Sequence, residues 1–467
     1  MAEAERLPRA PWRDNLEAMT MAIVMALVLK IFVVEAYKIP TGSMQPTLIG
    51  DERAGIQDRI LVDKLSYALR DPRRWEVAVF RYPLNRAQNF VKRVVGIGPE
   101  ELRIRDGDLW HRPDSAAEWR ILRRPRSVQR DTWKKLDALA PEASSWQPED
   151  PRVDWECTAR AIQASGPGRA AFRGGKEAIV DLYFDGYPEA IAKRISRAPR
   201  ESGDNPVGDL RVEGKIRARP GTTLFTIELE EGLRRYRFEI PGPAAAAGES
   251  PRIEVLELGS NGSGDGAAAR VLAAEPLRLS AERTLTFGAQ NLDDLLELEL
   301  DGRVVAALEI LATSDQDSAA HLELTGDGAE LEELMVARDI YYLDRGASEV
   351  VVPPDCYFML GDNTQDSADS REWRFKRYRT SDAETLVRGE ARDGENPRVV
   401  GYGDPDGAKL AFRDEWGERH WMKLAEAREI TPEDAHFVPR ELVLGRALAV
   451  FWPIDPFHDV LRLKWVR

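Results

Sequence analysis

The chain is poor in the residues that build disulfide frameworks and metal centres. Its 467 residues include only 2 cysteines and 5 histidines. Cys157 and Cys356 stand apart and outside any C-x-x-C motif, so we expect neither a disulfide scaffold nor a cysteine-rich zinc site. The histidines contain no i, i+4 pair, which excludes an H-E-x-x-H zinc motif; they are His111, His321, His420, His436 and His458. We therefore expect a chemistry that needs no metal and no cofactor.

Positive charge is also in deficit. The 66 lysines and arginines are outnumbered by 80 acidic residues, which gives a net charge of -14. This is the wrong sign for a protein that binds phosphate backbones, so nucleic acid is not expected as a partner. A content of 43% hydrophobic and 31% charged residues is typical of a folded protein. The length predicts two or three domains.

Only one long stretch lacks charge almost completely. Residues 18–34 are apolar except for Lys30, whose aliphatic stem can stay in lipid while its ammonium reaches the headgroups. At about 1.5 Å per residue the stretch spans roughly 25 Å, close to the ~30 Å of a hydrocarbon core. We expect a short cytoplasmic tail over 1–15 and a transmembrane helix over 16–37. The alternatives are a buried globular helix and a cleaved secretory signal ending near 34–36.

Charges before this stretch predict its orientation. Arg6, Arg9 and Arg13 precede it, and the positive-inside rule then places the N-terminus in the cytoplasm. Everything after Tyr37 would lie on the far side of the membrane. The expected location is the cell (inner) membrane, single-pass, with the lipid bilayer as a partner.

A serine follows the apolar stretch in an unusual setting. Pro40, Gly42 and Pro46 surround Ser43 and exclude a regular helix. The backbone they favour is extended and turned, and it can present one hydroxyl to a bound chain. Most serines are structural or solvated, so Ser43 needs a group that can take its proton.

Lys92 is a candidate for that group. Residues 89–97 are rich in β-branched and aromatic side chains and predict a strand. Lys92 lies between Val91 and Arg93. Burial and a like charge would both lower its pKa from about 10.4 and yield a neutral amine. The alternative is a surface lysine on an edge strand.

A polar loop is the third element. Residues 361–371 follow the strand-like segment 356–360 and are dense in Asp, Asn and Ser, which favours a hydrogen-bonded loop that can fix a neighbour. A simple turn or a weak calcium loop are the alternatives. The spacing of an EF-hand is missing.

In this order, the three elements resemble those of type I signal peptidases, the membrane-anchored serine proteases that remove signal peptides. The resemblance covers roughly a third of the chain. It lies in the anchor and in the motifs P-T-G-S-M-x-P-T-L (40–48), I-L-V-D-K-L-S-Y (60–67), F-V-K-R-V-V-G (90–96), G-D-N-x(3)-S-x-D-S-R (361–371) and L-G-R-A (444–447). It implies a mainly β protein with an antiparallel catalytic core.

The resemblance also implies residue roles. Ser43 corresponds to the family's nucleophile and Lys92 to its general base. Thr41 corresponds to the position whose hydroxyl holds the oxyanion together with the Ser43 N–H. Ser367 corresponds to a serine that orients the lysine, and Asp369 and Arg371 to a supporting ion pair, while Asp362 and Asn363 look structural.

Specificity follows from the same correspondence. The family cuts after small residues at the -1 and -3 positions of exported preproteins, so signal peptides are the expected partners. The corresponding pocket residues are Ile39, Pro40, Met44, Leu48, Phe90 and Val91. One departure is the order Gly98-Pro99, where the family has proline before glycine, which leaves the turn after the lysine strand open.

The rest of the chain exceeds a minimal core. A hairpin is expected over 102–110 with an Asp-Gly turn, and a helix over 128–139. From about 221 the pattern becomes strand after strand, with flexible loops at 241–250 and 259–269, which predicts an inserted β-sandwich with a structural role or an unidentified ligand. The predicted order is core 38–111, insertion 112–345 with the sandwich from about 208, core 346–374, a smaller insertion over 375–434 and core 435–467.

Two other functions are alternatives to a signal peptidase. A self-cleaving repressor-type protease uses a similar Ser/Lys pair, but it is soluble and carries a DNA-binding module, which the anchor and the acidic charge argue against. A non-catalytic, membrane-tethered binding protein would rely on the sandwich alone. The presence of Ser43, Lys92 and Ser367 together favours a peptidase.

Overall fold

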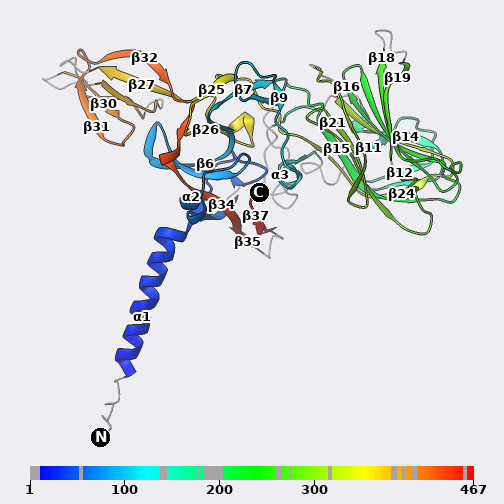
Figure 1. The fold of residues 1–467 in the computed structure, drawn as a ribbon, viewed down its shortest axis with the longest axis horizontal. Helices are drawn as coiled ribbons and strands as arrows, with labels where there is room; N and C mark the ends of the chain where they lie inside the picture. The colour runs from blue at the N-terminus through cyan, green and yellow to red at the C-terminus, as the bar shows by residue number, and fades with distance from the viewer. Residues whose placement is uncertain are drawn as a thin grey trace, which may run out of the picture.

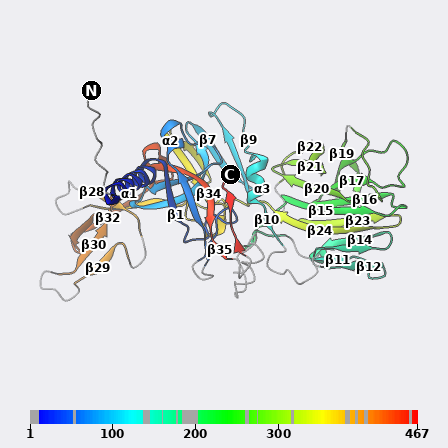
Figure 2. The same cartoon turned by 90° about the horizontal axis from the view of Figure 1, so that it is seen from below.

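The computed structural model is mainly β, with one long apolar helix at the N-terminus (Figure 1), as predicted. The structure describes residues 11–51, 56–136, 145–158, 160–175, 179–182, 203–258, 264–273, 275–313, 318–379, 386–391, 395–401, 407–455 and 460–467. Most of the predicted tail 1–15 lies outside these residues. A central β core carries a large sandwich at one end and a small β unit at the other (Figures 1 and 2).

The helix ends earlier than predicted. Helix α1 (Pro11–Val28) continues into the π-helical turn η1 (Leu29–Val33), and strand β1 (Val34–Lys38) starts at the next residue. The segment Asn15–Val33 has a mean hydropathy of 2.2, is not buried by the protein, and is long and apolar enough to span a membrane. The prediction of helix to residue 37 is therefore wrong for its last four residues, because β1 pairs with strand β4 (Arg59–Asp63).

Lys64 connects the C-terminal end of the apolar helix to the core by hydrogen bonds. Its Nζ donates to the carbonyls of Lys30 and Ile31 at 3.4 Å each, and it pairs with Glu35 at 2.6 Å. Its backbone N–H donates to the Val33 carbonyl at 2.9 Å. These bonds satisfy carbonyls that a helix end leaves without intrahelical partners.

The core sheet assembles strands from distant parts of the chain. Its order is β1, β4, β34 (Val443–Trp452), β5 (Val77–Tyr82), β6 (Asn85–Ile97), β26 (Cys356–Leu360) and β33 (Val438–Pro439), and β37 (Lys464–Trp465) pairs with β34. All these pairings are antiparallel. The sheet thus brings the Lys92 strand next to the segment that leads into the polar loop.

Shorter elements surround this sheet. The predicted hairpin is confirmed as β7 (Glu100–Arg105) and β8 (Asp108–Arg112), with φ of 52° at Asp106 and 92° at Gly107, and it lies in one sheet with β9 (Arg120–Ile121) and β25 (Glu349–Val352). Helix α3 covers Arg126–Thr132, starting two residues before the predicted helix 128–139 and ending earlier; residues 137–139 are outside the described part. The remaining elements are β2 (Gly50–Asp51), β3 (Ile56–Gln57), α2 (Leu65–Leu69), η2 (Arg173–Gly175), η3 (Thr364–Asp366), η4 (Arg440–Leu442), β35 (Ile454–Asp455) and β36 (Val460–Leu461).

The exchanged order Gly98-Pro99 has a steric reason. Gly98 does not adopt a positive φ. A Cβ at this position would lie 1.7 Å from the carbonyl oxygen of Pro353, so the close approach of the 353 segment requires glycine there.

The inserted sandwich consists of two sheets. One has the order β12 (Trp155–Cys157), β13 (Ile162–Ala164), β24 (Ala329–Arg338), β15 (Leu210–Ala218), β20 (Leu285–Leu292), β21 (Leu295–Leu300) and β22 (Arg303–Glu309), with β10 (Lys134–Lys135) on β24. The other has the order β11 (Trp146–Pro148), β14 (Gly168–Phe172), β23 (Ser318–Thr325), β16 (Leu224–Glu231), β17 (Arg234–Pro241), β18 (Arg252–Leu258) and β19 (Gly264–Leu272). One apolar cluster lies between the two sheets. In it the ring centroids of Phe225 and Phe287 are 5.1 Å apart.

The sandwich differs from its prediction in two places. Strands β10 to β14 join it from before residue 208. Strand β19 occupies part of the predicted loop 259–269, because pairing with β18 orders a glycine- and alanine-rich segment; residues 259–263 lie outside the described part.

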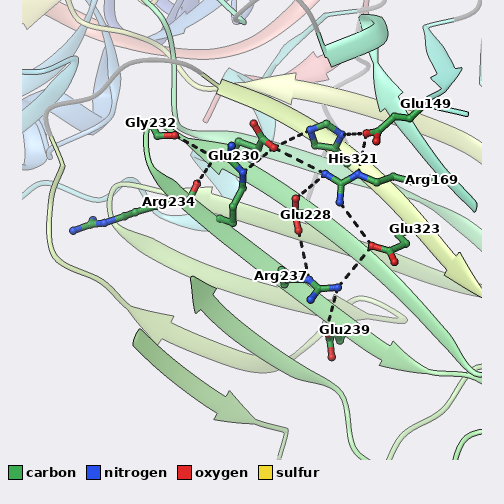
Figure 3. A network of polar contacts seen from close by, with 11 residues as sticks. Glu149, Arg169, Glu228, Glu230, Gly232, Arg234, Arg237, Glu239, His321 and Glu323 are labelled. Atoms are coloured by element: carbon green, nitrogen blue, oxygen red, sulfur yellow. Dashed lines mark hydrogen bonds and ion pairs between the residues drawn. The ribbon is translucent and has the colours of Figure 1, made fainter. Parts of the chain in front are cut away.

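The polar face of the second sheet carries a charge network (Figure 3). Arg169 pairs with Glu149 and Glu228 at 2.8 Å each. His321 lies 2.7 Å from Glu149 and 3.1 Å from Glu230. Strand alternation explains this face, because the residues between these on β16 point into the apolar cluster.

The smaller insertion is folded. Strands β27 (Arg374–Arg379), β28 (Leu386–Gly389) and β32 (Arg428–Asp434) form one three-stranded sheet, and β29 (Arg398–Val400), β30 (Lys409–Arg413) and β31 (Arg419–Lys423) form another. They share a buried cluster of Tyr378, Val387, Leu410, Phe412 and Met422. The smaller insertion is therefore a folded unit with an apolar cluster of its own.

Candidate active site

Ser43 and Lys92 lie next to each other and line one cavity of the core. Ser43 lies in the turn after β1, and Lys92 is on β6, 49 residues later. The Nζ of Lys92 is 2.7 Å from the Oγ of Ser43. This distance is a hydrogen bond, so a proton can pass directly between the two atoms.

The surroundings of Lys92 favour its neutral form. The side chain is buried, with 3% exposed. Burial lowers its pKa to about 8, with Asp369 opposing this shift and Arg371 adding to it. The sequence predicts that the charge of Arg93 also lowers the pKa of Lys92. In the structure Arg93 instead forms a salt bridge with Asp362 at 2.7 Å.

The polar loop docks on the serine turn. The Asn363 amide Nδ2 donates to the Gly42 carbonyl at 3.2 Å, and the Asn363 backbone N–H donates to the Ser43 carbonyl at 3.1 Å. Asn363 therefore bonds to the backbone of the serine turn, which fits its expected structural role. Gly361 permits the close contact, since a Cβ there would lie 2.5 Å from the Ser43 carbonyl oxygen and 2.1 Å from the Ser367 Oγ.

Ser367, Asp369 and Arg371 form a buried group beside the lysine. Ser367 Oγ donates to Asp369 Oδ2 at 2.8 Å. Arg371 donates to both oxygens of Asp369, at 2.8 Å each, and Gly361 donates its N–H at 3.0 Å. Although burial alone would raise it, Arg371 holds the pKa of Asp369 below its usual value. The orienting role of Ser367 toward Lys92 stays a prediction, because its hydroxyl is directed to Asp369.

A second buried ion pair, Arg93–Asp362, connects the segments that carry the site. Arg93 and Asp362 are both fully buried and meet through two bonds of 2.8 and 2.7 Å. Thr47 donates its hydroxyl to Asp362, and Arg93 donates to the carbonyls of Trp75 and Arg467. The pair joins the serine segment, the lysine strand and the polar loop, a role for Arg93 that its position in the sequence did not signal.

A cavity of about 730 Å³ opens at the Ser43–Lys92 pair. Five of the six predicted pocket residues line it, together with Thr41 and Ser367: Ile39, Pro40, Met44, Phe90 and Val91. Leu48 does not; it is fully buried and packs with Ile39 and Met44 in an apolar cluster. The prediction of Leu48 as a pocket residue is wrong because its side chain points into the core.

The cavity has further lining residues that the motifs did not name. They include Tyr37, Lys38, Gln88, Asn89, Arg345, Gln365 and Glu372. Gln88 is the one residue of this set that strand alternation from Phe90 could have identified.

Comparison with known proteins was consistent with the geometry. The family model for signal peptidase, peptidase S26, matches residues 12–141 and 298–387. A probable signal peptidase I-2 of Synechocystis sp. is 37% identical over 112 residues, which is 23% of this chain and 48% of that protein. Signal peptidase I of Pseudomonas fluorescens is 39% identical over 109 residues, or 21% and 36% of the two chains.

A third relative gives the same result. Signal peptidase I of Pseudomonas aeruginosa is 40% identical over 93 residues, covering 17% of this chain and 31% of that protein. The chain spans less than half the length of each of these three relatives. The resemblance to type I signal peptidases is thereby confirmed. Among solved structures, the Emp47p carbohydrate recognition domain matches at 10% identity, over 46% of this chain and 99% of that one, with a TM-score of 0.28, a level that does not establish a shared fold.

Proposed function

We propose that the chain is a membrane-anchored serine endopeptidase that removes signal peptides from exported preproteins, with Ser43 as nucleophile and Lys92 as general base. The observation that carries the proposal is the 2.7 Å contact between a serine hydroxyl and a buried lysine amine of lowered pKa. This is the arrangement that nucleophilic catalysis requires when no histidine is at hand.

The reaction follows from these positions. Neutral Lys92 accepts the Ser43 proton as Oγ attacks the scissile carbonyl, and the resulting ammonium protonates the leaving amine. The Ser43 N–H and the Thr41 hydroxyl hold the oxyanion, and Thr41 lines the cavity as this role demands. A water then attacks the acyl-enzyme, with Lys92 again taking a proton.

The cavity supports recognition of an extended peptide with small side chains. Ile39, Met44 and Val91 present apolar surface next to Ser43. Pockets of this kind admit methyl groups and exclude bulk, which fits small residues at the -1 and -3 positions. Replacing alanine by phenylalanine at either position of a test preprotein should abolish cleavage.

The apolar span supports membrane anchoring, with the N-terminus in the cytoplasm and the core on the extracytoplasmic side. Arg6, Arg9 and Arg13 are the basis for this orientation. Reporter fusions after Lys38 and at the N-terminus test it.

Preprotein cleavage in detergent tests the mechanism. Ser43→Ala and Lys92→Met should each lose at least roughly a thousandfold in kcat, as when a nucleophile or its base is removed. Lys464→Met is a matched control, because burial lowers the pKa of Lys464 to about 8 as well, and that residue is not among those lining the cavity. Near-parental cleavage by either dyad variant rules out the mechanism, provided that the control is active.

A further inference from the structure

Three aspartates gather where the sandwich joins the core. Asp108 begins β8 of the core hairpin, Asp209 directly precedes β15, and Asp293 lies in the turn between β20 and β21. One carboxylate oxygen from each lies within 4.8 Å of the others. A polar cavity of about 440 Å³ adjoins them, lined by Asp108 and Asp209 among others.

One carboxylate oxygen of this cluster has no hydrogen-bond partner in the described part of the chain. Asp293 is 3% exposed, and its Oδ2 makes no hydrogen bond within the described part of the chain. Leaving a buried carboxylate oxygen unpaired is costly, and proteins satisfy such groups with a hydrogen bond, a counter-charge or a metal ion. The orphaned atom belongs to a carboxylate that has an oxygen within 4.8 Å of an oxygen of each of the other two.

The nearby cations are engaged elsewhere. Arg124 pairs with Asp339 at 2.7 Å, and Arg123 pairs with Glu309 at 2.8 Å while donating to the Asp293 backbone carbonyl. Within the described part of the chain, three carboxyl groups are thus packed together without a salt bridge to any of them.

We infer that Asp108, Asp209 and Asp293 bind a calcium ion that fastens the inserted sandwich to the catalytic core. The three carboxylate oxygens lie close enough together for one ion to contact all of them at the 2.3–2.6 Å distances of Ca²⁺. Ca²⁺ takes six to eight oxygens, and the cavity has room for waters beside the three carboxylates. No local motif reveals this site, since its ligands are 84 residues or more apart in the chain.

The geometry ties two parts of the chain together. The Asp293 N–H donates to Asp209 Oδ2 at 3.0 Å, and the Asp339 N–H donates to the Asp209 carbonyl at 2.9 Å, so the sandwich side is already ordered. On the core side, the Tyr342 N–H donates to the Gly107 carbonyl at 2.9 Å, next to Asp108. An ion in this position would bridge both sides.

Calcium binding to the full-length protein in detergent tests the inference. Isothermal titration with CaCl2 should give one saturable site per chain, and MgCl2 should bind at least tenfold more weakly. Asp108→Asn, Asp209→Asn and Asp293→Asn should each weaken binding at least tenfold. Asp106→Asn is the matched control, because Asp106 lines the same cavity but is outside the three, and asparagine suits its positive φ.

Thermal unfolding separates a ligand site from a purely structural cluster. At a calcium concentration a hundredfold above Kd, the parent midpoint should rise by roughly 5–10 °C. Without calcium, each triad variant should be as stable as the parent or more so, because a repelling charge is gone. No saturable calcium binding by the parent overturns the inference. Binding that survives in all three variants, or is lost in Asp414→Asn at the Asp414–Glu418–His420 loop, also overturns it.

Discussion

Cleavage should rise with pH through a midpoint close to 8, the value to which burial lowers the pKa of Lys92. The ammonium cannot accept the Ser43 proton, so activity follows the neutral fraction. With a pKa of about 8 that fraction is ~9% at pH 7 and ~91% at pH 9, so kcat/KM should rise about tenfold. An unshifted lysine near 10.5 would be only ~0.03% neutral at pH 7, so burial increases the active form about 300-fold.

A second lysine makes the assignment testable. Lys464 on β37 has a pKa lowered to about 8 by burial, with Arg462 adding to the shift. A midpoint near 8 in the parent could therefore come from either lysine. Lys464→Met should leave the midpoint in place if Lys92 is the base.

Initial rates at substrate concentrations well below KM, from pH 6 to 10, give kcat/KM and thus the pKa of the free enzyme. A flat profile refutes a lysine base. A midpoint near 10.5 refutes the claim that burial tunes Lys92. Loss of the midpoint in Lys464→Met refutes the assignment to the dyad.

Three further results are expected. Lys92→Met should raise the midpoint of thermal unfolding at pH 7. Because the pKa of Lys92 is lower in the folded than in the unfolded chain, this lysine reduces the free energy of unfolding by up to about 3 kcal/mol below pH 8. It has no effect above about pH 10.5, where the unfolded chain has also lost its proton; a lower midpoint of the variant in calorimetry contradicts this. Asp362→Ala should cost about 3–5 kcal/mol in denaturant unfolding, since it leaves Arg93 buried without its counter-charge; a cost under about 1 kcal/mol would show the pair to be dispensable. Gly361→Ala should lower kcat roughly a hundredfold by displacing the Ser43 carbonyl, whereas unchanged kcat would mean that the loop can move aside.

Much of the site could be predicted because its residues lie in short motifs. The turn around Ser43 and the strand of Lys92 each follow from local composition, and the Asp106-Gly107 turn follows from the preference of these residues for positive φ. Bringing the two reactive groups together required the resemblance, since nothing local relates residues 49 positions apart.

The features that the sequence did not predict correctly have physical causes. Strand β19 is rich in glycine and alanine and gains its order from pairing with β18, which overrides local propensity. Leu48 sits in a motif of pocket residues, but its own side chain faces the core. The partners of Arg93 and the three clustered aspartates depend on long-range packing, and no periodicity encodes them.

The helical segment ends at Val33 and strand β1 begins at Val34, with no linker between them. This junction sets the distance from the membrane surface at which a substrate would be cut. The five residues of β1 span about 17 Å at ~3.3 Å each, and its last two, Tyr37 and Lys38, already line the cavity. Because Lys64 bonds to both the end of the apolar helix and β1, the distance between the membrane and the cavity is fixed. A preprotein would have to present its scissile bond at that level above the lipid, so a flexible spacer inserted here should blur the choice of cleavage position.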